Sequence, residues 1–168
     1  MSDDFEPDDF LLLDVPAPLY IFDLDGTLSN MDHRMHLLEP KTDAAHDEFT
    51  RLSADDKPYP KVITVLNNLL HGGAEIWIFT GRRSEVREET VKWLIQHTDL
   101  TYTELETGLI MREAGSREPD LQMKRRWYEQ MLDCDKERLV AVFDDRQRVV
   151  DMWRSLGLTC LQVRAAAY

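Results

Sequence analysis

Cysteine, positive charge and long apolar stretches are all scarce in this sequence. Its two cysteines, Cys134 and Cys160, lack CxxC spacing and fall within an expected helix and an expected strand. Reduced thiols in the core of a cytosolic protein explain them better than a disulfide framework. No stretch approaches the roughly 20 apolar residues that a transmembrane helix needs. The acidic first residues also lack the basic leader of a secretory signal. We therefore expect a cytoplasmic protein.

The shortage of positive charge narrows the range of functions. The chain has 20 lysine and arginine residues against 32 aspartate and glutamate residues, which gives a formal net charge of −12. A surface of this sign repels duplex DNA at long range and argues against a general nucleic-acid coat protein. A local basic pocket for a single phosphate is still compatible with this balance.

The sequence does contain a regular alternation of short apolar runs and helical patterns. Runs that indicate buried strands lie at residues 19–22, 76–79, 108–111, 139–143 and 159–163. Apolar residues at helical spacing predict helices at 60–71, after Ser84, from Pro119 to Leu132, and at 149–156. This order predicts an α/β fold with three Rossmann-like layers, in which helices cover both faces of a mostly parallel five-stranded sheet.

Two segments depart from the alternation. Residues 1–16 are an acidic leader that we expect to be disordered, and residues 17–168 are expected to form one domain. Residues 29–59 follow the first strand and are mostly polar, and 43–52 is their best helical candidate. Open α/β sheets bind ligands beyond the carboxyl ends of their strands. We therefore predict that 29–59 forms a small helical cap over a site.

Polar signatures follow three of the predicted strands. Asp23 and Asp25 end the first, Thr80-Gly81-Arg82 ends the second, and Asp144 and Asp145 end the fourth. Each alone is typical of a turn, a loop or a helix cap. Because the carboxyl ends of parallel strands share one edge of the sheet, the three signatures are expected to converge there.

Convergence would bring four carboxylates close to one point. Like charges at short distance raise one another's pKa unless a cation lies between them. Ligands that are all oxygen favour magnesium. The pattern therefore predicts a Mg²⁺ site that includes Asp23, Asp25, Asp144 and Asp145.

These signatures, in this order, resemble those of haloacid dehalogenase (HAD) superfamily phosphatases, over about residues 20–163. The resemblance implies the HAD fold and an aspartyl-phosphate intermediate on Asp23. It implies that Asp25 protonates the leaving group and then activates water, and that Thr80 holds the phosphoryl oxygens. Mg²⁺ would be bound by the carboxylates of Asp23 and Asp144 and by the Asp25 carbonyl, with Asp145 in support.

A cation is also expected near the transferring phosphoryl group. Lys124 is the candidate, because it continues the spacing of the buried face of its predicted helix, and Asp120 lies four residues earlier on the same side. A lysine on an apolar helical face is uncommon without a partner. The alternative is a lysine at the helix edge whose amine reaches solvent.

A closer resemblance narrows the substrate. The segments 28–34 and 143–154 are similar to the phosphatase domains of phage polynucleotide kinase-phosphatases, and so is the pairing of Asp120 with Lys124. That family removes 3′-phosphates from nucleic-acid ends, and a phage-encoded member would act in the host cytoplasm. The resemblance implies that Arg34, Gly81-Arg82 and Asp120 belong to the substrate site and that Arg146 borders it.

Several alternatives stay open at this point. No GxxxxGK[ST] motif is present, so the kinase half of that family is missing. A (deoxy)nucleoside monophosphate is the rival substrate, and a catalytically silent binding domain with the same fold is the rival class. Arg34 and Arg82 could also be ordinary surface residues. We expect a phosphorylated nucleic-acid end or a nucleotide as substrate, no membrane association and no obligate protein partner.

Overall fold

The computed structural model describes residues 16–166, and its centre is a five-stranded sheet. All four strand pairs are parallel, in the order β5-β4-β1-β6-β7, so the predicted parallel sheet is confirmed. The strands are β1 (Leu19–Phe22), β4 (Glu75–Arg83), β5 (Leu109–Arg112), β6 (Leu139–Arg146) and β7 (Cys160–Ala166). β1 lies in the middle, which puts the residues that follow it at the centre of the sheet's carboxyl edge.

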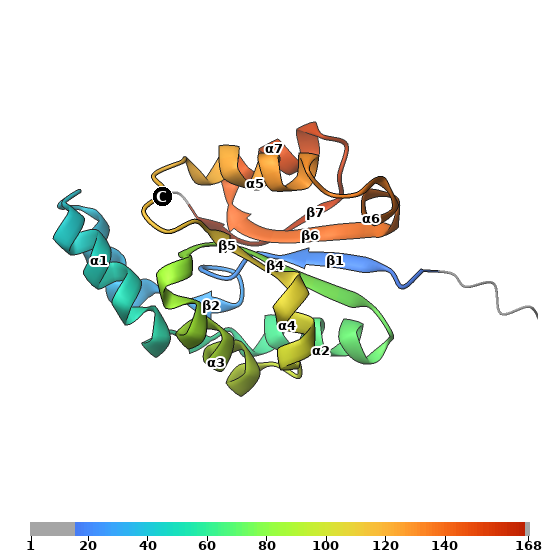
Figure 1. Ribbon diagram of the computed structural model, residues 1–168, viewed down its shortest axis with the longest axis horizontal. Helices are drawn as coiled ribbons and strands as arrows, with labels where there is room; N and C mark the ends of the chain where they lie inside the picture. Colours follow the sequence, from blue (N-terminus) through green and yellow to red (C-terminus); the bar gives the residue numbers. More distant parts are fainter. Residues whose placement is uncertain (1–15, 167–168) are drawn as a thin grey trace, which may run out of the picture.

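Helices cover both faces of the sheet and complete three layers (Figure 1). One face carries α2 (Pro60–His71), α3 (Arg87–His97) and α4 (Tyr102–Gly108). The other carries α5 (Asp120–Glu129), α6 (Asp133–Arg138) and α7 (Gln147–Ser155). No helix within residues 16–166 combines the length and the apolar character needed to cross a membrane.

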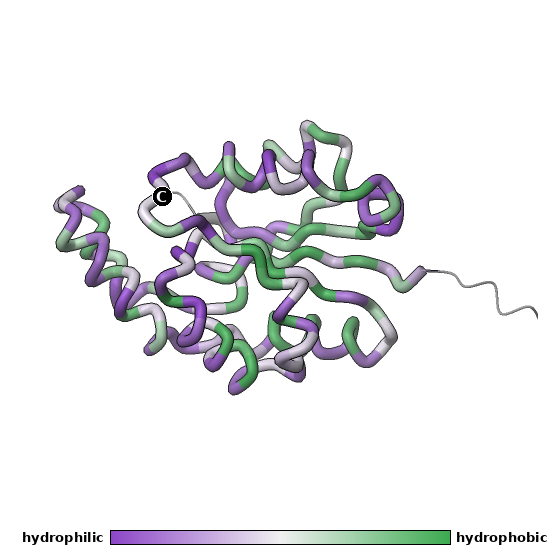
Figure 2. The backbone as a smooth tube through the Cα atoms, viewed as in Figure 1, coloured by the Kyte–Doolittle hydropathy of each residue, from purple (hydrophilic) through white to green (hydrophobic). Residues whose placement is uncertain are grey.

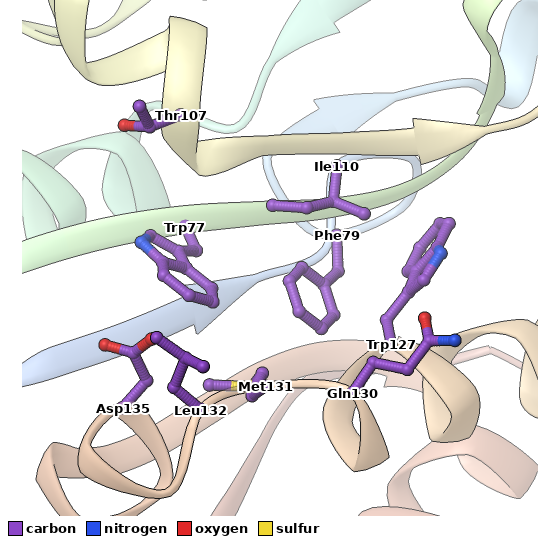
Figure 3. Close-up of a pocket in the computed structure, with 9 residues that line it drawn as sticks. All are labelled: Trp77, Phe79, Thr107, Ile110, Trp127, Gln130, Met131, Leu132 and Asp135. Carbon is purple, nitrogen blue, oxygen red and sulfur yellow. The ribbon is translucent and has the colours of Figure 1, made fainter.

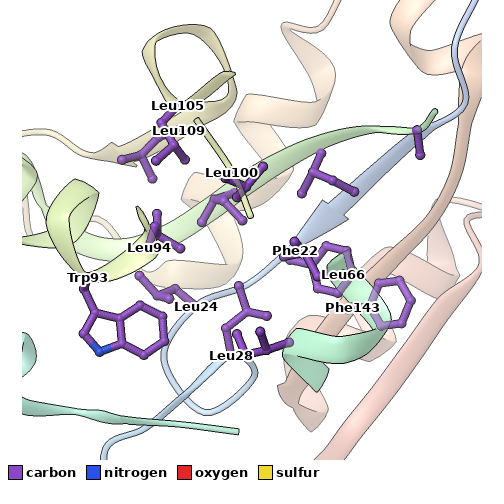
Figure 4. Close-up of a cluster of buried hydrophobic side chains, with 14 of the residues drawn as sticks. Phe22, Leu24, Leu28, Leu66, Trp93, Leu94, Leu100, Leu105, Leu109 and Phe143 are labelled. Carbon is purple, nitrogen blue, oxygen red and sulfur yellow. The ribbon is translucent and has the colours of Figure 1, made fainter. Parts of the chain in front are cut away.

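Two apolar cores form where the sheet meets its helices. The larger core lies on the α2–α4 side, where the rings of Phe22 and Phe143 stack with their centroids 4.2 Å apart (Figure 4). The second core surrounds the fully buried Trp153 on the α5–α7 side. Figure 2 shows the hydrophobic strands in the centre and the hydrophilic outer turns of the helices. Burial on both faces explains why these strands are short continuous apolar runs in the sequence.

The segment between β1 and α2 contains only short elements. A two-stranded antiparallel ribbon pairs β2 (Ser29–Asn30) with β3 (Lys57–Pro58). Between these strands lie the 3₁₀ helices η1 (Asp32–Leu38) and η2 (Leu52–Asp55) and the helix α1 (Asp43–Arg51). α1 stands beyond the carboxyl edge of the sheet and buries none of its residues (Figure 1).

The structure corrects two expectations near α5. The helix predicted to reach Leu132 ends at Glu129, and Leu132 is 68% exposed. Cys134, predicted to lie in the core, is exposed in the short α6, whereas Cys160 is buried in β7 as expected. The apolar spacing continued past the real end of α5, so it placed Leu132 on the wrong element. Residues 1–15, most of the predicted acidic leader, lie outside the described part of the chain.

Candidate active site

The loop after β1 places the first two aspartates. The backbone N–H of Asp23 donates to the carbonyl of Phe143 at 2.8 Å, so the β1–β6 pairing continues to Asp23. The chain then turns sharply at Gly26, whose φ of 92° is readily adopted only by glycine, and the Gly26 N–H donates to the Ser29 carbonyl. The turn separates the surroundings of Asp23 from those of Asp25.

Three of the four predicted carboxylates gather at one point. Asp23, Asp144 and Asp145 are all buried, and one oxygen from each lies within 4.8 Å of the others. Asp25 is not a member of this group, because its carboxylate is bound by Ser29 and by two arginines. The expectation of four carboxylates around one point was therefore wrong by one. The carbonyl of Asp25 as a metal ligand stays a prediction.

Lys124 lies among these carboxylates. Its Nζ donates to Asp23 Oδ1 at 2.6 Å and to Asp144 Oδ2 at 2.8 Å, and it is 3.8 Å from Asp120 Oδ2. The side chain is fully buried, which excludes a lysine whose amine reaches solvent. Burial alone would lower the pKa of Lys124, but the charges of Asp120, Asp144 and Asp23 outweigh it and raise that pKa well above its ordinary value. These contacts favour the protonated form of Lys124.

Asp23 itself carries an excess of negative surroundings. Burial raises the pKa of its carboxyl group, and Asp144, Asp145 and Asp120 raise it further, so that the opposing charge of Lys124 does not restore it. A divalent cation would remove this imbalance. The donors are carboxylate oxygens only, which fits Mg²⁺. Asp23 and Asp144 would hold the ion, supported by Asp145.

Asp25 lies in a second network, which joins it to Arg34 and Arg82. Arg34 Nη2 and Arg82 Nε each donate to Asp25 Oδ1 at 2.8 Å. Both arginines are buried, so neither is an ordinary surface residue. Burial would raise the pKa of Asp25, but the charges of Arg82 and Arg34 hold it well below its usual range. One nitrogen of Arg82, Nη1, is buried without a hydrogen-bond partner.

The same arginines share a second acid, Asp56, that the sequence analysis missed. Asp56 Oδ2 accepts from Arg34 Nη2 at 2.6 Å and from Arg82 Nη2 at 2.7 Å, and the residue is 3% exposed. The carbonyl of Asp56 also accepts from the indole of Trp93 at 2.7 Å. Two buried arginines require more than one counter-charge. The need for a second acidic partner was the only clue to such a residue in the sequence. It did not identify Asp56, because nothing in the polar segment 53–60 distinguishes Asp56 from Asp55.

The remaining predicted residues lie next to these two groups of charges, where Thr80 contacts Arg82 and Asp120 contacts Lys124. The Thr80 hydroxyl is buried and accepts from the Arg82 N–H at 3.1 Å. Gly81 lies against Asp120, since a Cβ at this position would be 3.1 Å from Asp120 Oδ1. Arg146 Nη1 donates to Asp120 Oδ2 at 3.3 Å. Asp120 thus lies between Arg146 and Lys124.

Arg112 was not predicted from the sequence, although it contacts Gly81 and lies close to Asp120. Its Nε donates to the Gly81 carbonyl at 3.0 Å, and its Nη2 is 3.7 Å from Asp120 Oδ1. Burial and the neighbouring charges of Arg83 and Arg146 lower its pKa, while Asp120 opposes them. The side chains of Arg112 and Arg146 are 14% and 22% exposed, so both reach the surface beside Asp120.

A groove of about 330 Å³ lies elsewhere, on the α5–α6 side of β4 and β5. Figure 3 shows the side chains of Trp77, Phe79, Ile110 and Trp127 around it. None of the residues that line it is one of the predicted site residues. We therefore do not assign the groove to the site.

Comparisons with known proteins agree with this fold. A chain of a Pnkp1/Rnl/Hen1 complex matches with a TM-score of 0.70 and 27% identity, over 92% of this chain and 49% of that chain. A chain of the Pnkp1/Rnl/Hen1 RNA repair complex gives 0.68 and 28%, over 92% and 45%. This chain spans about half the length of those two. The class C acid phosphatase from Bacillus anthracis shares the fold, with a TM-score of 0.60 and 17% identity over 90% of this chain and 68% of that one.

A family model described as the polynucleotide kinase PNKP phosphatase domain matches residues 17–168. The match includes the carboxylate group, Lys124 and both buried arginines. Because it covers nearly the whole chain, the protein belongs to the HAD-type family of polynucleotide kinase PNKP phosphatase domains.

Proposed function

We propose that this protein is a Mg²⁺-dependent phosphomonoesterase that removes 3′-phosphates from polynucleotide ends through an aspartyl-phosphate intermediate on Asp23. One observation carries the proposal: the buried Lys124 bridges Asp23 and Asp144 at 2.6 and 2.8 Å. A fixed cation beside a carboxylate nucleophile is where a transferring phosphoryl group gains most stabilisation.

Each step can be written for residues of this chain. The Asp23 carboxylate attacks phosphorus, and the ester oxygen leaves with a proton from Asp25. Asp25 then takes a proton from a water molecule that attacks the same phosphorus, which frees phosphate and restores Asp23. Thr80 and the backbone amides of the loop after β1 hold the phosphoryl oxygens. Mg²⁺, when bound, neutralises part of their charge.

Arg34 and Arg82 control the protonation state of Asp25. In the described structure they keep its carboxyl group ionised, which is the state that accepts the proton of water. Asp25 can protonate the leaving group only if its pKa rises, which requires that its interactions with Arg34 and Arg82 weaken. The substrate phosphate is a competing acceptor for the same guanidinium groups, and the unpartnered Nη1 of Arg82 is a further donor.

A polynucleotide end is the substrate that the surroundings favour. Arg112 and Arg146 reach the surface beside Asp120, where the next phosphate of a nucleic-acid strand could be bound. The similarity to chains of an RNA repair complex supports the same choice. The two free cysteines, Cys134 and Cys160, fit a cytoplasmic location.

The second candidate is a nucleoside monophosphate. The net charge of −12 supports it, because such a surface offers little to hold a long strand. The choice between the two substrates depends on whether Arg112 and Arg146 offset this negative charge next to the site.

The test compares phosphate release, with Mg²⁺ present, from a 3′-phosphorylated oligonucleotide, its 5′-phosphorylated isomer, and free 3′- and 5′-mononucleotides. We expect the 3′-phosphorylated oligonucleotide to have the highest kcat/KM. A preference for free mononucleotides would favour the second candidate. Absence of phosphate release from all four, together with hydrolysis of a simple aryl phosphate, would refute both candidate substrates. If the aryl phosphate is also left intact, the result favours a catalytically silent domain.

A further inference from the structure

His33 is an exposed side chain that contacts the network around Asp25, and the proposed chemistry gives it no role. It lies in η1, directly before Arg34. Its Nε2 is 2.9 Å from Asp56 Oδ1, and the side chains are 40% and 0% exposed respectively. The imidazole thus reaches from the surface of the cap segment to a buried carboxylate.

Four residues contact the Asp56 carboxylate, and His33 is one of them. Oδ1 accepts from Arg34 Nε at 2.8 Å and lies against His33, whereas Oδ2 accepts from Ser29, Arg34 and Arg82. Without His33, Oδ1 keeps only its hydrogen bond from Arg34 Nε, whereas Oδ2 keeps all three of its donors. The contacts of the carboxylate then become unequal on its two oxygens.

Asp56 is connected to Asp25 through two arginines. Arg34 Nη2 bonds both acids, at 2.6 Å to Asp56 Oδ2 and 2.8 Å to Asp25 Oδ1. Arg82 also bonds both, at 2.7 Å to Asp56 and 2.8 Å to Asp25. Two guanidinium groups therefore connect the carboxylate that His33 contacts to the proposed acid and base.

We propose that His33 is a positioning residue, which fixes the Asp56 carboxylate and through it the arginines that orient Asp25. This inference rests on the proposed function, because it assigns His33 to the step in which Asp25 protonates the leaving group. Asp32, the residue before His33 in η1, lies 3.6 Å from Arg164 of β7.

The role predicts a dependence on the leaving group. A general acid matters most when the departing oxygen is strongly basic, as in a nucleoside 3′-phosphate, and least for p-nitrophenyl phosphate. A residue that positions Asp25 should therefore affect the two substrates unequally. A residue that only supports the fold should affect them alike.

The experiment measures kcat and KM of His33→Ala and His33→Gln on a 3′-phosphorylated oligonucleotide and on p-nitrophenyl phosphate, together with Tm. His71→Ala is the matched control, because His71 pairs with Asp99 at 3.1 Å on a surface where the side chains are 65% and 51% exposed. We expect His33→Ala to lower kcat on the oligonucleotide about 10-fold and on p-nitrophenyl phosphate less than about threefold. The amide of His33→Gln should restore part of the loss, and His71→Ala should match the wild type.

Three results would overturn the proposal. His33→Ala could keep full kcat on the oligonucleotide, or it could lose both activities equally with a lower Tm, which indicates support of the fold. A wild-type protein that hydrolyses neither substrate would contradict the proposed function, and the role of His33 would fall with it. A wild type that is active beside an unaffected His33→Ala contradicts the role of His33 alone.

Discussion

At the scale of single residues, the site depends on buried charges that balance one another. Arg34 and Arg82 lie between Asp25 and Asp56, so two cations face two anions inside the protein. Removing one member of such a set leaves a buried charge without its counter-charge. This destabilises the folded protein far more than replacing all the charges by apolar residues would.

Asp56→Asn tests this balance. The amide keeps the shape of the side chain but removes its charge, so we expect a loss of about 3–5 kcal/mol in the free energy of unfolding and a large loss of kcat. Chemical denaturation measures the first and phosphate release the second. Asp55→Asn is the control, since Asp55 is exposed beside Asp56 and should change stability by less than about 0.5 kcal/mol. Equal effects of the two variants would refute the role given to Asp56.

The two cysteines should differ sharply in reactivity. Burial, and secondarily the charge of Asp144, raises the pKa of Cys160 to about 12, so almost none of it is thiolate near neutral pH. Cys134 is exposed. A thiol reagent at pH 8 should therefore modify one cysteine of the folded protein quickly, and peptide mapping should identify it as Cys134. Rapid modification of Cys160 would show that β7 opens more readily than the structure implies.

At the scale of elements, the ends of β1 and β6 bring Asp23, Asp144 and Asp145 together, and α5 adds one cation. Three carboxylates against one lysine leave an excess of negative charge. We expect Mg²⁺ to raise Tm, because an ion that binds only the folded state stabilises it by about 2.7 kcal/mol at 100 times its Kd.

Variants separate this site from general salt effects. Asp144→Asn should abolish the Mg²⁺-dependent rise in Tm, whereas Asp133→Asn should preserve it, because the Asp133 side chain is 94% exposed in α6. A rise of the same size in all three proteins would mean that Mg²⁺ acts elsewhere on this acidic chain.

Elements with a strong periodic signal could be predicted from the sequence. The strand ends pointed to Asp23, Thr80 and Asp144 and the helical spacing pointed to Lys124, and the structure places all four at the carboxyl edge of the sheet. Their roles in the reaction stay predictions. Asp56 could not be found, because it lies in an irregular segment where its partners are 22 and 26 residues away. α4 was missed, although Thr101 and Glu104 form the capping box that marks its start.

For the whole molecule, the net charge of the chain is negative, whereas the proposed phosphate site is rich in arginine. The chain carries a net charge of −12, while arginines surround the place where a phosphate would be bound. Binding should therefore be local to the end of a strand.

This contrast predicts how affinity depends on strand length. KM for a 3′-phosphorylated trinucleotide and for a 20-nucleotide strand should agree within about threefold, because nucleotides far from the end meet an acidic surface. Steady-state kinetics at fixed ionic strength measures both values. A KM that falls more than about tenfold with length would indicate an extended binding surface.

The proposed mechanism requires that Asp23 becomes phosphorylated during turnover. The most direct measurement is acid quenching during the reaction with a 3′-phosphorylated oligonucleotide and Mg²⁺, followed by mass spectrometry of the peptides. We expect one added phosphoryl group on Asp23 in the wild type, and neither that group nor multiple turnovers in Asp23→Asn. A phosphoryl group on another residue, or repeated turnover by Asp23→Asn, would contradict it.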